Sequence, residues 1–458
     1  MADTRPEPTH PADEMLSHRR LAALGLQHVL VMYAGAVAVP LIIGRAMKLP
    51  PVQVALLVNA DLLCCGIATI IQSLGATALF GIRLPVMMGV TFVAVGPMLA
   101  MANDPTIGLP GIFGAIIVAG IFTMIVAQDI GHVMPLFPPV VTGTIIFMIG
   151  ITLMRVGVNW AAGAPAPDLP GYGDPLHIGM ALLVLAAILL ITRFGRGYIA
   201  NIAVLLGIVI GAGVAAAIGK MSFAKVVAAP WFQLVQPLQF GSPTFLPAAV
   251  IPMCVVMVVV MIESSGMFLA VGEMAGRPAS QQDVTRGLRA NGLGTLVSGL
   301  FNSFALTSFS QNIGLVGVTG VKSRFVCVAG GVILMAMGCI PKLGALVEAI
   351  PIFVLGGAGI VMFGMVSATG LRILSEVDFK SDTTNILVVG AAIAIGLVPL
   401  IEPRVLAGMP PQLGPFLHSG ILMTAATAVL LNFLFNGLGS APARGSNTGQ
   451  RARAPSLR

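Results

Sequence analysis

Charged residues are scarce in this sequence, and their scarcity excludes most classes of water-soluble protein. Only 9% of the 458 residues are Asp, Glu, Lys or Arg, whereas soluble domains carry about 25%. The hydrophobic fraction is 57% and the mean hydropathy is +0.98. A large soluble enzyme would need extended polar surfaces, which are absent here. The composition therefore predicts a polytopic membrane protein without a soluble domain.

Recognisable catalytic and metal-binding motifs are also missing. The five cysteines fall within apolar runs and lack metal-ligand spacing, so they are interpreted as packing residues and no metal site is expected. There is no phosphate-binding loop, no HExxH motif and no nucleophile with its partners. An ATP-driven pump and a membrane enzyme are therefore unsupported, and no cofactor is expected. The pI of about 9.5 has a topological explanation and requires no nucleic-acid partner.

Long apolar runs dominate the sequence, and a membrane-spanning helix takes about 20 residues. The sequence predicts an all-α protein with fourteen transmembrane segments, at 21–44, 52–74, 84–101, 110–130, 135–156, 176–193, 199–219, 245–270, 283–302, 303–320, 323–341, 345–370, 384–401 and 415–437.

The basic residues indicate how these segments are oriented. With the N-terminus inside, 17 of the 24 lysines and arginines are cytoplasmic, and the external ones are Arg45, Lys48, Arg155, Lys220, Lys225, Lys342 and Arg404. An odd number of segments would place the C-terminal arginines outside. We therefore expect both termini in the cytoplasm. The membrane that holds the protein is expected to be the inner membrane of the cell. The polar stretch 1–20 shows no cleavable signal.

A polar-interrupted stretch at 220–244 divides the segments into two sets of seven, so the second set must be inverted relative to the first. The third segment of each set is irregular. Residues 83–97 and 304–314 both begin with β-branched, aromatic and helix-breaking residues and then become helical. We predict a short strand followed by a half-helix in each, with the strands paired antiparallel near the bilayer midplane. The alternative is two kinked helices that pack through small residues.

Two polar positions within the membrane are candidates for a substrate site. Gln311 and Asn312 lie in the irregular tenth segment, where an unpaired carboxamide costs about 2–7 kcal/mol. Glu263 lies near the middle of the eighth segment after a long apolar run. Its carboxyl group could accept hydrogen bonds from ring N–H groups or carry a proton, and the alternative is a structural carboxyl paired within the bundle.

Three further polar residues within the segments have less specific interpretations. His28 in the first segment is a candidate for site support, although a lone histidine in a helix is most often a packing residue. Asp61 in the second segment could line the cavity or form a structural hydrogen bond. Asn291 in the ninth segment is expected to hydrogen-bond between helices.

The stretch Gln311–Gly320 resembles the signature of the nucleobase–ascorbate transporter family. That signature reads Gln, Glu or Pro, then Asn, any residue, Gly, four residues of any kind, Thr, and finally Arg, Lys or Gly. The stretches Gln27–Tyr33 and Glu263–Met267 look like the same family. The resemblance extends over about 21–437, and the wider context is most similar to bacterial urate/xanthine permeases.

This resemblance implies a core domain and a gate domain that move against each other. The core would comprise 21–131 and 245–341, and the gate 132–220 and 342–437, with an external connection at 221–244. The cytoplasmic tail 1–20 and a disordered tail at 438–458 fall outside the resemblance. It also implies homodimerisation through the gate, although no residue pattern demands a dimer.

The resemblance further implies proton-coupled uptake of a nucleobase that binds between the strands of segments 3 and 10. The implied substrate contacts are Thr91, Phe92, Glu263, Ser310 and Gln311, with His28, Asp61, Asn291 and Asn312 in proton coupling or site support. Uracil-type relatives usually carry Glu at the first signature position, so Gln311 favours an oxidised purine. The choice between urate and xanthine stays open.

Two departures from the family pattern and three alternatives remain. Many purine carriers have Asp at the position of Asn291, so proton coupling could rest on Glu263 alone. Ala305 replaces a proline that is common near the strand.

The alternative functions are a uracil or pyrimidine symporter, an anion carrier of the same architecture, and a scaffold or receptor that transports nothing. An anion carrier would not present a central carboxylate such as Glu263 to its substrate.

Overall fold

The computed structural model describes residues 10–437 apart from 103, 165, 166, 168, 407, 411 and 412. The predicted C-terminal tail at 438–458 lies outside the described residues. The long helices are α1 (His18–Ala46), α2 (Pro51–Leu74), α4 (Gly108–Val126), α6 (Pro139–Ala161), α7 (Pro175–Phe194), α11 (Pro247–Ala275), α12 (Gln281–Leu300), α16 (Ile352–Leu374) and α17 (Thr384–Ile401).

Shorter elements connect and interrupt these helices. Two are strands, β1 (Met88–Val90) and β2 (Leu306–Ser308), and each is followed by a short helix, α3 (Val95–Ala102) and α13 (Ser310–Thr319). The others include η1 (Pro11–Asp13), α5 (Ile130–Val133), α8 (Tyr198–Asn201), α9 (Ala203–Ala217), α10 (Ala224–Ala228), α14 (Arg324–Gly338), α15 (Pro341–Glu348), α18 (Gly414–Leu417) and α19 (Gly420–Asn436).

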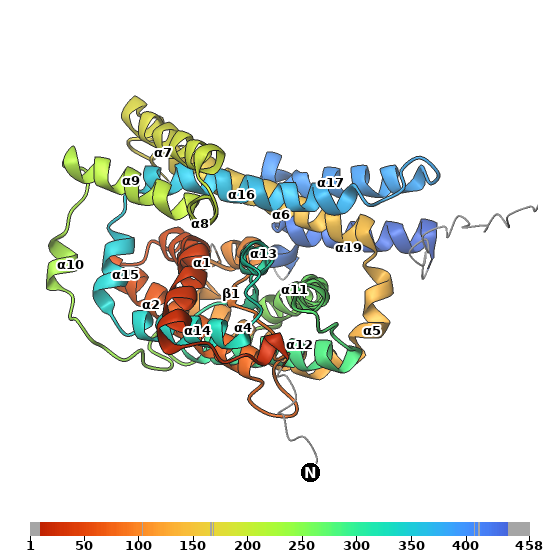
Figure 1. Cartoon of the computed structure of the whole chain (residues 1–458). Helices are drawn as coiled ribbons and strands as arrows, with labels where there is room; N and C mark the ends of the chain where they lie inside the picture. The colour runs from red at the N-terminus through yellow and green to blue at the C-terminus, as the bar shows by residue number, and fades with distance from the viewer. Residues whose placement is uncertain are drawn as a thin grey trace, which may run out of the picture.

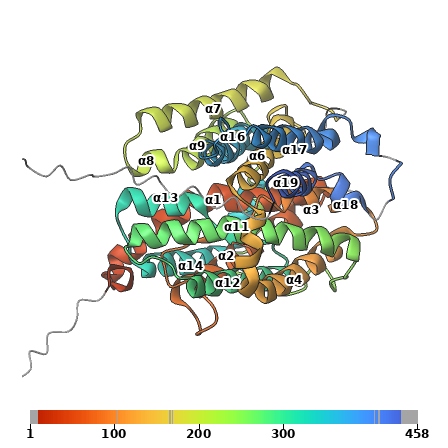
Figure 2. The same cartoon turned by 90° about the vertical axis from the view of Figure 1, so that its right-hand side faces the viewer.

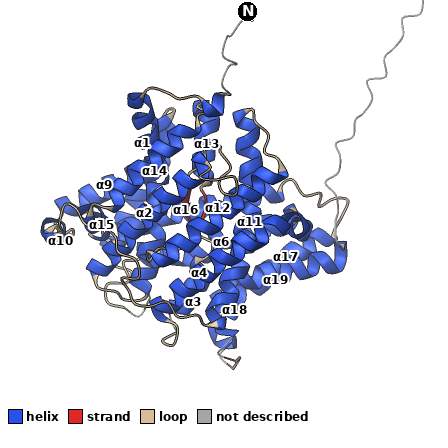
Figure 3. Cartoon of the chain, turned by 90° about the horizontal axis from the view of Figure 1, so that it is seen from below, coloured by secondary structure: helices blue, strands red, loops and turns tan. Residues whose placement is uncertain are grey.

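The helices form three layers (Figures 1 and 2). One outer layer contains α6, α7, α9, α16, α17 and α19, and the opposite layer contains α2, α4, α12 and α14, while α1, α3, α11 and α13 lie between them. The strand pair is enclosed by helices at the centre of the molecule (Figure 3). This arrangement places both interrupted segments in the middle layer, facing the α6–α16 pair.

Eight described helices are long and apolar enough to cross a membrane, or up to nine if the bent pair α14–α15 is one span. Helix α12 is 20 residues long, but its first turns are polar, with Gln281, Asp283 and Arg286. Each of the fourteen predicted segments overlaps a helix or a strand–helix unit. The number of segments that span the bilayer stays a prediction.

One predicted segment boundary was wrong. The twelfth segment was expected at 345–370, but residues up to Glu348 belong to α15, and α16 begins only at Ile352. Pro341 starts α15 and Pro351 precedes α16, and a proline favours the first turn of a helix while breaking the one before it. Helix α15 therefore forms a separate arm bent by 79° from α14.

The polar N-terminal stretch is structured from residue 10 and packs on helix ends of the core. Asp13 Oδ1 lies 2.7 Å from Arg324 Nε at the start of α14. The ring of His10 hydrogen-bonds the carbonyl of Gly276 after α11, with a separation of 3.2 Å. Ala12 between them is fully buried. Helix α1 begins at His18, so its first residues lie within the stretch 1–20 that was predicted to be a tail.

Helices α6 and α16 approach each other closely through glycines. A Cβ at Gly370 would meet the Cα of Phe147 at 2.6 Å and the carbonyl oxygen of Gly143 at 2.7 Å. In a bilayer, close contact between backbones is a main source of helix–helix affinity. This helix pair therefore depends on the absence of a side chain at Gly370.

We predict that Gly370→Leu separates α6 from α16 and lowers the stability of the folded protein by at least about 1–3 kcal/mol, the usual cost of overpacking. The measurement is thermal unfolding of the detergent-solubilised protein, followed by size-exclusion chromatography. Gly390→Leu on α17 is the matched control, because nothing lies within 4 Å of a Cβ there. Equal melting temperatures for the two variants would contradict this account of the α6–α16 contact.

Candidate functional site

The two strands of the interrupted segments pair antiparallel at the centre of the molecule. Gly89 lies opposite Thr307, flanked by the pairs Met88–Ser308 and Val90–Leu306. The pairing continues at both ends, because Thr91 N donates to Ala305 O over 2.9 Å and Phe309 N donates to Met87 O over 2.9 Å. The strands thereby satisfy much of each other's backbone, and every residue of both strands is buried.

Threonines from two neighbouring helices satisfy the outer edges of this small sheet. Met88 N donates to the hydroxyl of Thr69 on α2 over 2.9 Å, and Leu306 N donates to the hydroxyl of Thr295 on α12 over 3.1 Å. Both threonines are fully buried. An unpaired buried N–H is costly, so these hydroxyls fix the strands to the helices behind them. Neither threonine was expected from the sequence to contact the strands.

The half-helices α3 and α13 both begin next to the sheet. Their first N–H groups have no partner within the helix, and each helix end carries partial positive charge. Phe309, directly before α13, is 4% exposed. Its ring occupies the space where a side chain at Gly35 of α1 or Gly89 of β1 would lie. That ring keeps α1, β1 and α13 together, so the two glycines permit the close approach.

Glu263 lies on α11, which packs against α13 and β2. Its side chain is half-buried, and it forms no hydrogen bond or ion pair with any residue between 10 and 437 that the structure describes. The adjacent Ser264 and Ser265 are both hydrogen-bonded and buried. The alternative of a structural carboxyl paired within the bundle therefore finds no support, and Glu263 is available to a ligand or a proton.

Gln311 and Ser310 form the exposed first turn of α13. Ser310 Oγ donates to Gln311 Oε1 over 3.2 Å, and the amide nitrogen of Gln311 donates to no described residue. The turn therefore presents an amide group with free donors, beside the helix N-terminus. Gln311, Ser310 and Glu263 lie on exposed or half-exposed faces of adjacent helices, as a site for a polar ligand requires.

Asn312 and His28 are buried and bind each other. Asn312 Nδ2 donates to the carbonyl oxygen of His28 over 2.8 Å and lies 3.0 Å from its Nδ1. The two side chains are 1% and 3% exposed, so neither faces a ligand. Their bonds attach α13 to α1, which holds the neighbouring Gln311 in position. Both residues support the site rather than line it.

Asn291 belongs to a buried hydrogen-bond chain that reaches Ser264, the residue that follows Glu263 on α11. Gln72 Nε2 donates to Asn291 Oδ1 over 3.1 Å, and Asn291 Nδ2 donates to Ser264 Oγ over 2.8 Å. Ser264 in turn lies 3.3 Å from the hydroxyl of Thr307 on β2. The chain therefore joins α2, α12, α11 and the sheet, and the amide of Asn291 keeps it uncharged.

Asp61 is fully buried, so its carboxylate does not face a space that a ligand could enter. Its carboxylate accepts a hydrogen bond from Ser303 Oγ over 2.6 Å, and Cys65 Sγ lies 3.5 Å away. Ser303 directly precedes the strand-bearing segment, so Asp61 fixes the entry to β2. Of the two interpretations of Asp61, the structural hydrogen bond agrees with this geometry and the cavity-lining one does not.

Thr91 and Phe92 lie where β1 turns into α3. Thr91 is 1% exposed, and its hydroxyl accepts a hydrogen bond from Val93 N over 3.2 Å. Phe92 is half-buried and meets Phe363 of α16 edge to face, with 5.9 Å between ring centroids. Phe92 is therefore the predicted contact that reaches across to the α6–α16 layer, while Thr91 shapes the turn.

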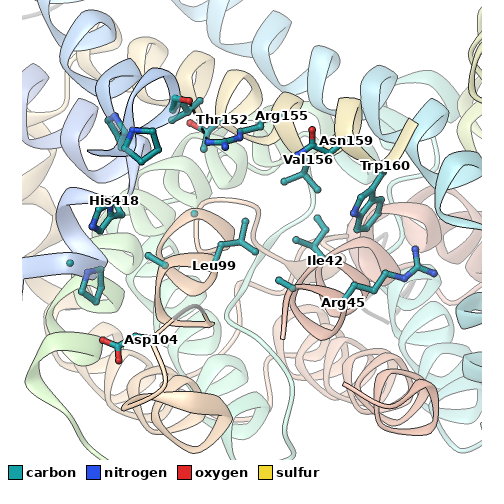
Figure 4. A pocket seen from close by; sticks show the side chains of 18 of the residues that line it. Ile42, Arg45, Leu99, Asp104, Thr152, Arg155, Val156, Asn159, Trp160 and His418 are labelled. Carbon is teal, nitrogen blue, oxygen red and sulfur yellow. Dashed lines mark hydrogen bonds between the residues drawn. The ribbon is translucent and has the colours of Figure 1, made fainter. Parts of the chain in front are cut away.

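A cavity of about 1180 Å³ opens between the layers at the ends of α1, α3, α6 and α17 (Figure 4). Its described lining includes Arg45, Lys48, Asp104, Arg155 and His418. Glu263 and Gln311 are not among the described lining residues. From the sequence, Arg45, Lys48 and Arg155 were expected only as external charges, because nothing in the sequence brings the four helix ends together.

Comparison with known sequences gives one family and several close relatives. The Permease family model matches residues 19–405. The uric acid transporter UacT of Escherichia coli is 50% identical over 94% of this chain and 89% of its own length. The xanthine permease of Bacillus subtilis is 42% identical over 90% and 93% of the two chains. The uric acid permease PucJ of the same organism is 41% identical over 91% and 93%.

Two solved structures with a similar fold are a bicarbonate transporter and an anion transporter of distant sequence. The transmembrane domain of the cyanobacterial bicarbonate transporter BicA has a TM-score of 0.58 and 16% identity, covering 93% of this chain and 99% of that one. The inward-facing murine anion transporter Slc26a9 has a TM-score of 0.61 and 11% identity, covering 93% and 70%. At such low identity these likenesses show the fold alone.

We predict that Asn312→Ala lowers the stability of the protein, because it leaves the buried His28 groups without their donor. An unsatisfied buried group costs about 1–3 kcal/mol. The measurement is the melting temperature of the solubilised protein, with Gln282→Ala as control, since Gln282 is an exposed residue at the start of α12. A melting temperature for Asn312→Ala equal to that of the control would show that the contact does not anchor α13.

Proposed function

The chain belongs to this Permease family, whose named relatives are transporters rather than enzymes, and on that premise we propose that it imports an oxidised purine, urate or xanthine, together with a proton. The observations that carry the proposal are the carboxyl of Glu263 on α11, which has no described partner, and the exposed Gln311 at the start of α13, a helix that packs against α11. The relatives named as uric acid and xanthine permeases are 41–50% identical to the chain. Their names support the purine class.

The two exposed groups fit the hydrogen-bonding edge of an oxidised purine. Such a ring alternates carbonyl acceptors with N–H donors, and a carboxamide offers both a donor and an acceptor. We propose that Gln311 reads one such pair, while Glu263 accepts from ring N–H groups in a charge-assisted bond. Phe92 would lie against the ring, and Ser310 would keep Gln311 oriented. The helix N-terminus adds partial positive charge.

Proton coupling follows from the same carboxyl group in this proposal. Glu263 has no fixed positive partner among the described residues, so its charge can change without breaking an ion pair. Asn291, where many purine carriers have Asp, lies in a neutral hydrogen-bond chain. Glu263 is therefore the proposed proton carrier, and the network around Asn291 holds it in position through Ser264.

We further propose the fourteen-segment inverted repeat with a core at 21–131 and 245–341 and a gate at 132–220 and 342–437. Helix contacts support it because they occur in equivalent pairs. The α2–α14 contact has its counterpart in α12–α4, and α7–α9 has its counterpart in α17–α19. Thr69 and Thr295, on the second segment of each half, also bind the two strands in the same way.

Movement of core against gate would expose the site to each side of the membrane in turn. The Phe92–Phe363 pair lies at the boundary where this sliding would occur. Placement in the inner membrane, cytoplasmic termini and a homodimer through the gate are parts of the same proposal. They rest on the charge distribution and on the family.

Two alternatives have less support. A pyrimidine symporter is disfavoured by Gln rather than Glu at position 311, since uracil-type relatives usually carry Glu there. An anion carrier has the support of fold likeness alone, to a bicarbonate transporter and an anion transporter at 16% and 11% identity. The carboxyl of Glu263 at the site would repel a small inorganic anion.

We predict that Glu263→Gln reduces proton-coupled purine uptake by at least about 100-fold, comparable to loss of an essential proton-transfer group. The neutral amide keeps the size of the side chain but can no longer gain or lose a proton. The measurement is initial uptake of radiolabelled urate and xanthine by cells with equal surface amounts of protein. Glu273→Gln, an exposed position on the same helix, is the matched control. Near-normal uptake by Glu263→Gln would remove this residue from the mechanism.

We predict that Gln311→Glu lowers purine affinity by about 10-fold or more, since one lost donor with an unpaired partner costs about 1–3 kcal/mol. A carboxylate only accepts hydrogen bonds, so the ring carbonyl opposite loses its donor. The measurement is competition of unlabelled xanthine, urate and uracil against labelled purine uptake. Gln282→Glu controls for an added surface charge, and a ligand profile that matches the control would refute this role of Gln311.

A further inference from the structure

The cavity between the layers has a positively charged lining. Its described walls carry Arg45, Lys48 and Arg155 against one carboxylate, Asp104, with His418 as a further titratable group. Lys48 is exposed, and its ammonium has no hydrogen bond or ion pair within the described ranges. Asp104 is already engaged, because it accepts hydrogen bonds from the backbone and the hydroxyl of Thr106 over 2.9 and 2.6 Å. The lysine charge is therefore available to a ligand.

Arg45 is held in place across the gap between the layers. Its Nη2 donates to the carbonyl oxygens of Glu348 and Ile350 over 3.3 and 3.2 Å. Its guanidinium lies over the ring of Trp160 on α6, 5.4 Å from the centroid. This fixed orientation matters because a preorganised cation loses little entropy when it attracts an anion. Arg45 thus has a constant position in the cavity wall, where the carboxylate of Glu348 partly offsets its positive charge.

Two lining residues also carry buried polar atoms without partners. Among the described residues, Arg45 Nη1 and Thr152 Oγ1 are buried and form no hydrogen bond. Buried donors normally find a partner, and an exception in a native protein calls for a ligand, ion or water. Among the described residues, Arg155 bonds through Nη1 alone, to Leu400 O over 3.3 Å. Together these groups offer donors on the α1 and α6 sides of the same cavity.

The cavity leads to the half-helix that follows the first strand. Gly96 and Leu99 of α3 line it, and α3 starts three residues after Phe92. The opening lies at the ends of α1 and α6, where the charge distribution predicts the external face. A ligand arriving from outside would therefore meet the cations before it reached the proposed site at Glu263 and Gln311.

We propose that this cavity captures the purine as an anion, and that it thereby favours urate over xanthine. Urate is a monoanion at neutral pH, whereas xanthine is largely uncharged, so the cations attract only the former strongly. The inference rests on the proposed function. At about 1180 Å³ the cavity exceeds an ordinary ligand pocket of about 300–1,000 Å³, which suits loose capture of a hydrated anion before transport.

Electrostatic capture changes encounter rates rather than the chemistry of the inner site. A like-signed lining raises the rate of association of an opposite charge by about 10–10³-fold, and the gain falls with ionic strength. The screening length is about 8 Å at physiological salt and about 3 Å at 1 M. Glu263 is not among the described residues that line the cavity, so its carboxyl does not touch the purine at this capture step.

The test compares urate and xanthine uptake by proteoliposomes that contain Lys48→Gln, Arg155→Gln or both. We expect Vmax/KM for urate to fall by about 3–10-fold in each variant, which is less than the full gain that electrostatic steering can give. Vmax/KM for xanthine should not change. Lys220→Gln is the matched control, because Lys220 is an exposed external lysine outside the described cavity lining. High salt should reduce the urate rate of the unmodified protein and leave xanthine unaffected.

The outcomes separate this inference from the proposed function. Equal effects on both purines, no effect on either, or a urate rate insensitive to salt would overturn anion capture while purine transport stood. If the unmodified protein took up neither purine, the proposed function and this inference would both fall. The capture site would be supported if the cavity variants lost uptake rate for urate alone. Lys220→Gln should then show no such loss, and high salt should leave xanthine uptake unchanged.

Discussion

The constraint on which the rest of the structure depends is the backbone of two interrupted segments inside the bilayer. At β1 and β2 the chain leaves the helical hydrogen-bond pattern, yet each buried N–H and C=O still needs a partner. The strands pair with each other, and Thr69 and Thr295 take up the outer N–H groups. Because this solution requires strands from both halves, it fixes where the two halves meet.

Once the sheet is fixed, the positions of the polar groups follow. The half-helices α3 and α13 must begin beside the sheet, so their unpaired N–H groups gather near the centre of the molecule. The bonds of Asn312 to His28, of Asn291 to Ser264 and of Asp61 to Ser303 consolidate this frame. These side chains are therefore engaged in structural hydrogen bonds. Glu263 and the amide nitrogen of Gln311 are left without described partners, and for that reason we propose them as the groups that meet substrate and proton.

The sequence was sufficient to predict the features that depend on local composition. The irregular residues 83–97 and 304–314 indicated both strands. Glu263 and Gln311 were singled out because polar groups at such depth are costly, and their role in a site stays a prediction. The register of Gly89 opposite Thr307 and the roles of Thr69 and Thr295 depend on how distant helices pack, which local sequence does not encode. For the same reason the sequence left Asp61 open between lining a cavity and forming a structural hydrogen bond, whereas the interhelical hydrogen bonds expected of Asn291 are present. The cavity at Arg45 and Lys48 arises from four separate helix ends, so its charges had seemed unrelated.

The central claim, that the unpartnered carboxyl of Glu263 couples a proton to purine movement, is tested most directly by proton flux during transport. Proteoliposomes holding the purified protein and an internal pH-sensitive dye would receive urate or xanthine without any imposed gradient. The account predicts that adding purine acidifies the lumen as substrate enters, and that an imposed inward proton gradient accumulates the purine. Purine entry with no change in internal pH, and no accumulation under the gradient, would contradict it.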